Sequence, residues 1–86
     1  KPLDLLIIVS TAESGRVLGP LAGACRRRGL RWGCFFTNDG VRALQDPELA
    51  RIMACAAQAI ACEHSWARFA GSEACPEVVV MNFVAS

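Results

Sequence analysis

The sequence predicts an α/β fold: a small three-layer sandwich built on a four-stranded, mostly parallel sheet, in one domain that spans residues 1–86. Apolar runs of strand length alternate with segments whose apolar residues recur at helical spacing. The run at residues 5–9 is continuously apolar rather than alternating, which is typical of a parallel strand covered on both faces. A chain of this length forms a single domain with a small core.

The first strand, residues 5–9, is followed by a helix. From Val17 onward the apolar residues recur at helical spacing, and Gly29 supplies a C-terminal stop. Pro20 is unfavourable in a helix interior, so we expect the helix to begin near Leu18 or to be kinked.

The second strand, residues 30–36, leads into a turn at residues 37–40. Its alternate residues, which we expect on one face, are Leu30, Trp32, Cys34 and Phe36. Asp46, Pro47 and Glu48 then supply an N-cap, a first-turn proline and a first-turn acid, which predict the start of the second helix. The buried stripe of that helix is expected to hold Leu49, Ile52, Met53 and Ala56.

The third strand is predicted at residues 58–62, although its alanines favour helix and leave one long helix over residues 47–69 as the alternative. A short helix over residues 65–70 follows and is broken by Gly71. Residues 77–84, rich in valine, predict the final strand.

We expect a flavodoxin-like strand order of 2-1-3-4, in which the loops after strands 1 and 3 lie side by side at the topological switch point. This order would bring Ser10 and Thr11 towards Cys62. Asn38 and Asp39, at the carboxyl end of strand 2, would lie on the same edge and are otherwise residues of a turn.

Charge and hydropathy exclude several classes of partner. The formal net charge is +1, so nothing argues for nucleic acid or an anionic membrane, and residues 5–9 are far too few to span a bilayer. The basic run at residues 26–28 falls at the end of the first helix, where its positive charge stabilises the helix C-terminus. The alternative is that this run binds phosphate. Hydrophobic residues make up 53% of the chain before its seven glycines are counted, whereas hydrophobic residues and glycine together usually make up about 45–50%. This excess of apolar residues predicts a homo-oligomer with an apolar interface.

Cysteine usage points to a reducing compartment. The five cysteines are an odd number, no pair shows C-x-x-C spacing, and no secretory signal peptide is evident, so we expect a cytoplasmic protein without a disulfide framework. Cys55, Cys62 and His64 do not match the ligand spacing of a zinc site, and we expect neither a metal nor a cofactor.

Cys62 is the strongest candidate for a reactive residue, because it is predicted at the junction between a buried strand and the helix that follows it. The partial positive charge and free N–H groups of a helix N-terminus stabilise a thiolate. His64, if protonated, would add to this effect, whereas Glu63 would oppose it. The plain alternative is that Cys62 is a small buried hydrophobe, since free cysteine is among the most buried residue types.

The chain resembles the DsrE/DsrF-like sulfur-relay family over nearly its whole length. The resemblance rests on the apolar strand and small-polar loop at residues 5–10, the segment Phe-Phe-Thr-Asn-Asp-Gly-Val at residues 35–41, and Ala-Cys-Glu-His-Ser at residues 61–65. The chain is shorter than most members, and residues 64–66 replace the small and basic residues that often follow the family's cysteine.

The resemblance implies that Cys62 accepts sulfane sulfur as a persulfide and passes it from a donor protein to an acceptor protein. Cys62 and His64 are then the candidate catalytic residues, and the candidate ligand-binding residues are Ser10, Thr11, Asn38, Asp39 and Ser65. Cys75 is a possible resolving thiol. Whether the chain turns over as a sulfurtransferase or only carries sulfur stays open.

Two other functions remain as alternatives. One is a non-catalytic oligomeric binding or assembly module with an inert thiol. The other is a small-ligand or nucleotide binder that uses the loops at the carboxyl ends of the strands.

Overall fold

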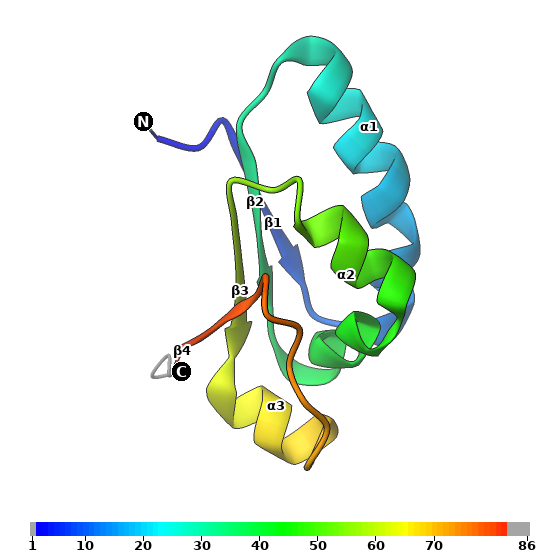
Figure 1. Cartoon of the computed structure of the whole chain (residues 1–86), viewed down its shortest axis with the longest axis vertical. Helices are drawn as coiled ribbons and strands as arrows, with labels where there is room; N and C mark the ends of the chain where they lie inside the picture. Colours follow the sequence, from blue (N-terminus) through cyan, green and yellow to red (C-terminus); the bar gives the residue numbers. More distant parts are fainter. Residues whose placement is uncertain (1, 83–86) are drawn as a thin grey trace.

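The computed structural model describes residues 2–82, which form one parallel sheet with its helices (Figure 1). The elements in chain order are β1 (Leu5–Val9), the 3-10 segment η1 (Ala12–Val17), α1 (Leu18–Arg28), β2 (Trp32–Phe36), the 3-10 segment η2 (Asn38–Gln45), α2 (Pro47–Met53), β3 (Gln58–Cys62), α3 (Glu63–Phe69) and β4 (Val80–Asn82). None of the helices in this part of the chain is long and apolar enough to cross a membrane.

The four strands pair in parallel in the order β1-β2-β3-β4, and one row of the register runs Ile8, Phe35, Ile60 and Val80. The predicted α/β class and four-stranded parallel sheet are confirmed. The predicted order 2-1-3-4 is wrong: β2, not β3, is the neighbour of β1. The apolar pattern of a strand indicates which side chains suit burial but not which strand lies beside it, so the pattern does not specify the neighbour.

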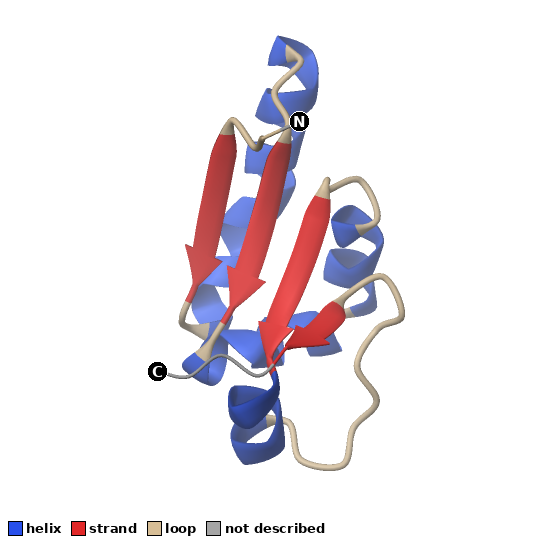
Figure 2. Ribbon diagram, turned by 90° about the vertical axis from the view of Figure 1, so that its left-hand side faces the viewer, coloured by secondary structure: helices blue, strands red, loops and turns tan. Residues whose placement is uncertain are grey.

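The sequential order explains where the helices lie. Parallel crossovers share one hand, so a chain that always steps to the next strand in the same direction puts its helices on one face. Figures 1 and 2 show α1 and α2 together on one side of the sheet, with α3 below its carboxyl end. We call the side with α1 and α2 the covered face and the other side the open face.

The core lies between the covered face and the helices. Val9, Cys34, Phe36 and Ala61, from three strands, are buried there with Leu18 of α1. Trp32, Cys34 and Phe36, predicted to share one face of the second strand, are buried together. Leu30, predicted on the same face, precedes β2 and is 39% exposed. Alternate residues of the same strands point the other way, as the two-residue period of a strand requires.

The open face differs from what the first strand predicted. We expected residues 5–9 to be covered on both sides, yet Leu6 is 52% exposed and Ile8 is 56% exposed. At the far edge of the same face, Val80 is 63% exposed. Among the described residues, only one of the two expected helical layers therefore lies over the strands (Figure 2).

Most predicted elements lie close to their expected positions. α1 begins at Leu18 and ends at Arg28, and the next residue, Gly29, has a φ of 67°, the left-handed conformation typical of a helix stop. β3 has the predicted bounds, so the long-helix alternative is wrong. α2 ends at Met53, three residues before Ala56. Residues 83 and 84, predicted to extend the last strand, lie outside the described residues.

Candidate functional site at the carboxyl edge of the sheet

Cys62 occupies the position that the sequence predicted, as the last residue of β3 and the N-cap of α3. It belongs to the open-face row of β3, because Ala59 and Ala61 alternate with it and are buried on the covered face. Cys62 is 6% exposed and forms no disulfide. The thiol thus lies at the carboxyl end of β3 but is largely enclosed by the protein.

Ser65, in the first turn of α3, joins the end of β3 to the end of β2. Its hydroxyl oxygen accepts a hydrogen bond from the backbone N–H of Asn38 at 2.8 Å, and its side chain is buried. Asn38 adopts a left-handed φ of 51°, which asparagine tolerates better than most residues. The structure therefore brings Asn38 and Ser65 together, with Ser65 as an internal acceptor rather than a residue facing solvent.

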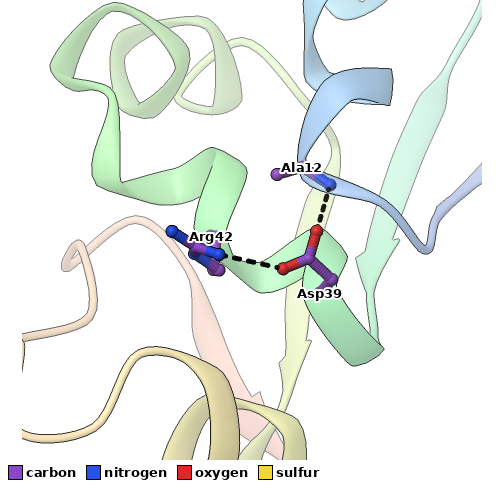
Figure 3. Close-up of polar contacts among 3 residues, drawn as sticks. All are labelled: Ala12, Asp39 and Arg42. Atoms are coloured by element: carbon purple, nitrogen blue, oxygen red, sulfur yellow. Dashed lines mark hydrogen bonds and ion pairs between the residues drawn. The ribbon is translucent and has the colours of Figure 1, made fainter.

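Asp39 makes the corresponding link between the ends of β2 and β1. One carboxylate oxygen accepts from the backbone N–H of Ala12 at 3.1 Å, and the other lies 3.4 Å from a guanidinium nitrogen of Arg42 (Figure 3). Arg42 was not predicted, although its position three residues after Asp39 is the spacing at which oppositely charged side chains meet on a helical turn. Both carboxylate oxygens are engaged within the fold.

The remaining predicted residues do not converge on Cys62. Thr11 caps η1: its hydroxyl accepts from the backbone N–H of Ser14 at 3.2 Å and lies 2.6 Å from the Ser14 hydroxyl. Ser10 is exposed beside it. Because β2 separates β1 from β3, the expectation that Ser10 and Thr11 lie next to Cys62 is wrong. His64 is exposed in the first turn of α3.

Gly40 is a residue of this edge whose importance sequence reasoning missed. A Cβ on Gly40 would lie 2.0 Å from the carbonyl oxygen of Val9, so only glycine fits. The backbone N–H of Thr37 donates to the same carbonyl at 3.0 Å. The close approach lets η2 seal the core, where it buries Val41 and Leu44. The sequence showed only a turn glycine, with no sign of the strand beneath it.

The other cysteines differ in environment. Burial, with a smaller contribution from the neighbouring Cys25 thiol, raises the pKa of Cys34 to about 11. Burial also raises the pKa of Cys75, which is partly buried rather than exposed as a resolving thiol would be. Cys55 is exposed beyond the end of α2. In the described part of the chain, no three His, Cys, Asp or Glu side chains converge as metal ligands.

The segments that follow β1, β2 and β3 therefore form a rim of linked loops, with the Cys62 thiol at one end. The hydrogen bonds that Asp39 and Ser65 accept tie the loops together, which leaves these side chains less able to bind a nucleotide. No protein-family model, curated protein or solved structure matches this chain. The resemblance to the sulfur-relay family stays a prediction.

Proposed function

We propose that this chain carries sulfur as a persulfide on Cys62 and passes it to a partner protein. The observation that supports this most directly is the position of Cys62 at the junction of β3 and α3. Of the five cysteines, all within the described residues, it is the one that stands at the carboxyl edge of the sheet. The rim of linked loops gives this thiol a fixed setting, which a carrier needs in order to meet its donor and acceptor in one geometry.

The proposed chemistry is two thiol exchanges without net oxidation. The Cys62 thiolate attacks the outer sulfur of a donor persulfide, a new S–S bond forms on Cys62, and the donor leaves as a thiolate. The acceptor thiolate then attacks the outer sulfur on Cys62, and the Cys62 thiolate leaves. His64, two residues further on and exposed, is the proposed acceptor of the Cys62 proton before the first exchange.

The test uses a Cys55→Ser/Cys75→Ser background, which removes the two cysteines that are not fully buried. After incubation with cysteine persulfide, intact-mass spectrometry is expected to detect one added sulfur atom, and peptide mapping to locate it on Cys62. The matched control adds Cys62→Ser, a nearly isosteric change, and is expected to gain none. Sulfur found on Cys25 or Cys34 instead, or on no residue, would contradict the proposal.

An oligomeric assembly module with an inert thiol is the second candidate. Two observations favour it: Cys62 is 6% exposed, and the open face presents apolar side chains at Leu6, Ile8 and Val80. Such a surface carries no charge to repel a second copy, so we propose that copies of this chain associate through their open faces. Under this candidate the thiol packs and does not react.

Association is tested by introducing one charge on the open face. Ile8→Glu is expected to give a monomer by sedimentation equilibrium at micromolar concentrations, where the unaltered chain is expected to be a homo-oligomer. Val17→Glu is the matched control, because Val17 is similarly exposed, at 53%, but lies on η1 rather than on the sheet. A monomeric unaltered chain would rule out association through this face.

The proposed setting is the cytoplasm, with donor and acceptor proteins as partners. Support comes from the five cysteines, none of which is in a disulfide. A reducing compartment maintains thiols in this state, and sulfur exchange requires a free thiol on each partner.

A further inference from the structure

A pocket of about 540 Å³ lies between α1, α2 and the start of β2. It is at the amino ends of the strands, whereas Cys62 is at their carboxyl ends. Trp32 and Ile52 contribute apolar surface to it, and Gly19 and Gly23 of α1 form part of its wall. Its volume falls in the range of about 300–1,000 Å³ that is usual for small-molecule sites.

The glycines of α1 keep the pocket open. Gly19 and Gly23 are four residues apart, so they share one face of the helix. A Cβ on Gly23 would meet only the guanidinium Nη1 of Arg27, at 3.4 Å, and a Cβ on Gly19 only the Cδ1 of Ile52, at 3.5 Å. Side chains could therefore be accommodated at both positions, and their absence is what leaves the space.

The charged residues that line the pocket are basic. Arg26 and Arg31 line it, and the position of Arg27 against Gly23 brings a third guanidinium to its edge. None of the lining residues in the described part of the chain is acidic. The arginines at the end of α1 also favour the helix C-terminus, but that interaction leaves their guanidinium groups charged.

We propose that this pocket binds a small organic acid, with its carboxylate on Arg26 and its apolar body against Trp32 and Ile52. A guanidinium presents paired N–H donors that match the two oxygens of a carboxylate. The apolar lining selects for a hydrophobic body rather than for a bare anion such as inorganic phosphate. The basic run at residues 26–28 thus acquires a role beyond the helix terminus.

The test is a titration of the ¹⁵N-labelled chain with 4-phenylbutyrate, followed by backbone amide shifts. Saturable shifts are expected at α1, Trp32 and Ile52. The neutral analogue 4-phenylbutyramide is expected to bind at least about tenfold more weakly, because it cannot form the charge-assisted pair with Arg26. Inorganic phosphate is expected to produce no saturable shifts at Trp32.

Two variants separate binding from folding. Gly23→Leu fills the pocket and replaces a helix-disfavouring residue, so it is expected to keep or raise Tm while abolishing the saturable shifts. Arg26→Gln is expected to raise Kd about tenfold. Arg28→Gln is the matched control, because Arg28 belongs to the same basic run but does not line the pocket, and its Kd is expected to be unchanged.

Cys55 supplies an independent readout because this exposed thiol also lines the pocket. Bound 4-phenylbutyrate is expected to slow alkylation of Cys55 but not of Cys75. Equal affinity for acid and amide, saturable binding that survives Gly23→Leu, or shifts confined to the open-face residues Leu6, Ile8 and Phe35 would each overturn the proposal.

Discussion

The two faces of one sheet differ sharply in this molecule, although the strands are apolar on both. On the covered face Val9 and Phe36 are almost completely buried, whereas their chain neighbours Ile8 and Phe35 point to the open face, where Ile8 is more than half exposed. Parallel sheets are normally covered on both sides. An apolar strand therefore indicates that both of its faces are suited to burial. It does not indicate that helices of the same chain cover both faces.

The cause of the difference lies in topology rather than in residue type. Sequential strand order with crossovers of one hand directs the helices to a single side. An order with a reversal would have divided the same helices between both sides. The open face is thus a consequence of the path of the chain, and its apolar side chains are the surface on which the assembly proposal rests.

Neighbouring phenylalanines on β2 test directly whether the two faces of the sheet are packed differently. Phe36→Ala is expected to lower the free energy of unfolding by about 3–5 kcal/mol, because it leaves a cavity in the core. Phe35→Ala, the matched control one residue away on the open face, is expected to cost only about 1–2 kcal/mol. Urea unfolding measures both. Equal losses would mean that the two faces are equally packed in solution.

Gly40 offers a sharper test of how the covered face is closed. A Cβ at this position meets the Val9 carbonyl oxygen at 2.0 Å, so Gly40→Ala must push η2 away from β1 and is expected to cost about 3 kcal/mol. Gly19→Ala is the control: its Cβ makes only an ordinary contact with Ile52, and it is expected to be neutral or stabilising because alanine favours helix. Thermal unfolding of the two variants gives the comparison. A Tm of Gly40→Ala near that of the unaltered chain would contradict the close approach.

Much of the fold could be predicted from local signals. Gly29 predicted the end of α1, Asp46 and Pro47 predicted the start of α2, and the apolar run at residues 5–9 predicted β1. These signals could be recognised because each depends only on residues that are close in sequence. The strand order could not be predicted in the same way, since it depends on contacts between segments far apart in the chain. The wrong order in turn misplaced Ser10 and Thr11 relative to Cys62.

The candidate site was predictable in position and not in detail. The junction of β3 and α3 at Cys62 followed from the end of an apolar run. The internal roles of Ser65 and Asp39 did not, because each hydrogen bond reaches a backbone N–H 27 residues away. The ion pair of Arg42 could have been predicted from its spacing to Asp39. The need for glycine at position 40 could not, because it depends on the close approach of the Val9 carbonyl, which only the structure shows.

The smallest expected effect concerns Cys34, a thiol of the covered face. Burial first, and then the Cys25 thiol, raise its pKa from 9.0 in an unfolded chain to about 11. Between these values the unfolded chain has lost the proton while the folded chain keeps it, so stability is fully present below pH 9 and falls as the pH rises towards 11. A shift of this size corresponds to a loss on the order of 2 kcal/mol.

Cys34→Ala isolates this loss by difference, because the other four cysteines and Lys1 titrate in both chains and the sequence contains no tyrosine. The variant is expected to be less stable at pH 7, where a cavity replaces the thiol, but to lose less stability than the unaltered chain between pH 9 and 11. Urea unfolding at several pH values measures the two slopes. Parallel curves would show that the Cys34 thiol ionises as readily in the folded chain as in the unfolded one, and that the covered face is more open to water than its packing indicates.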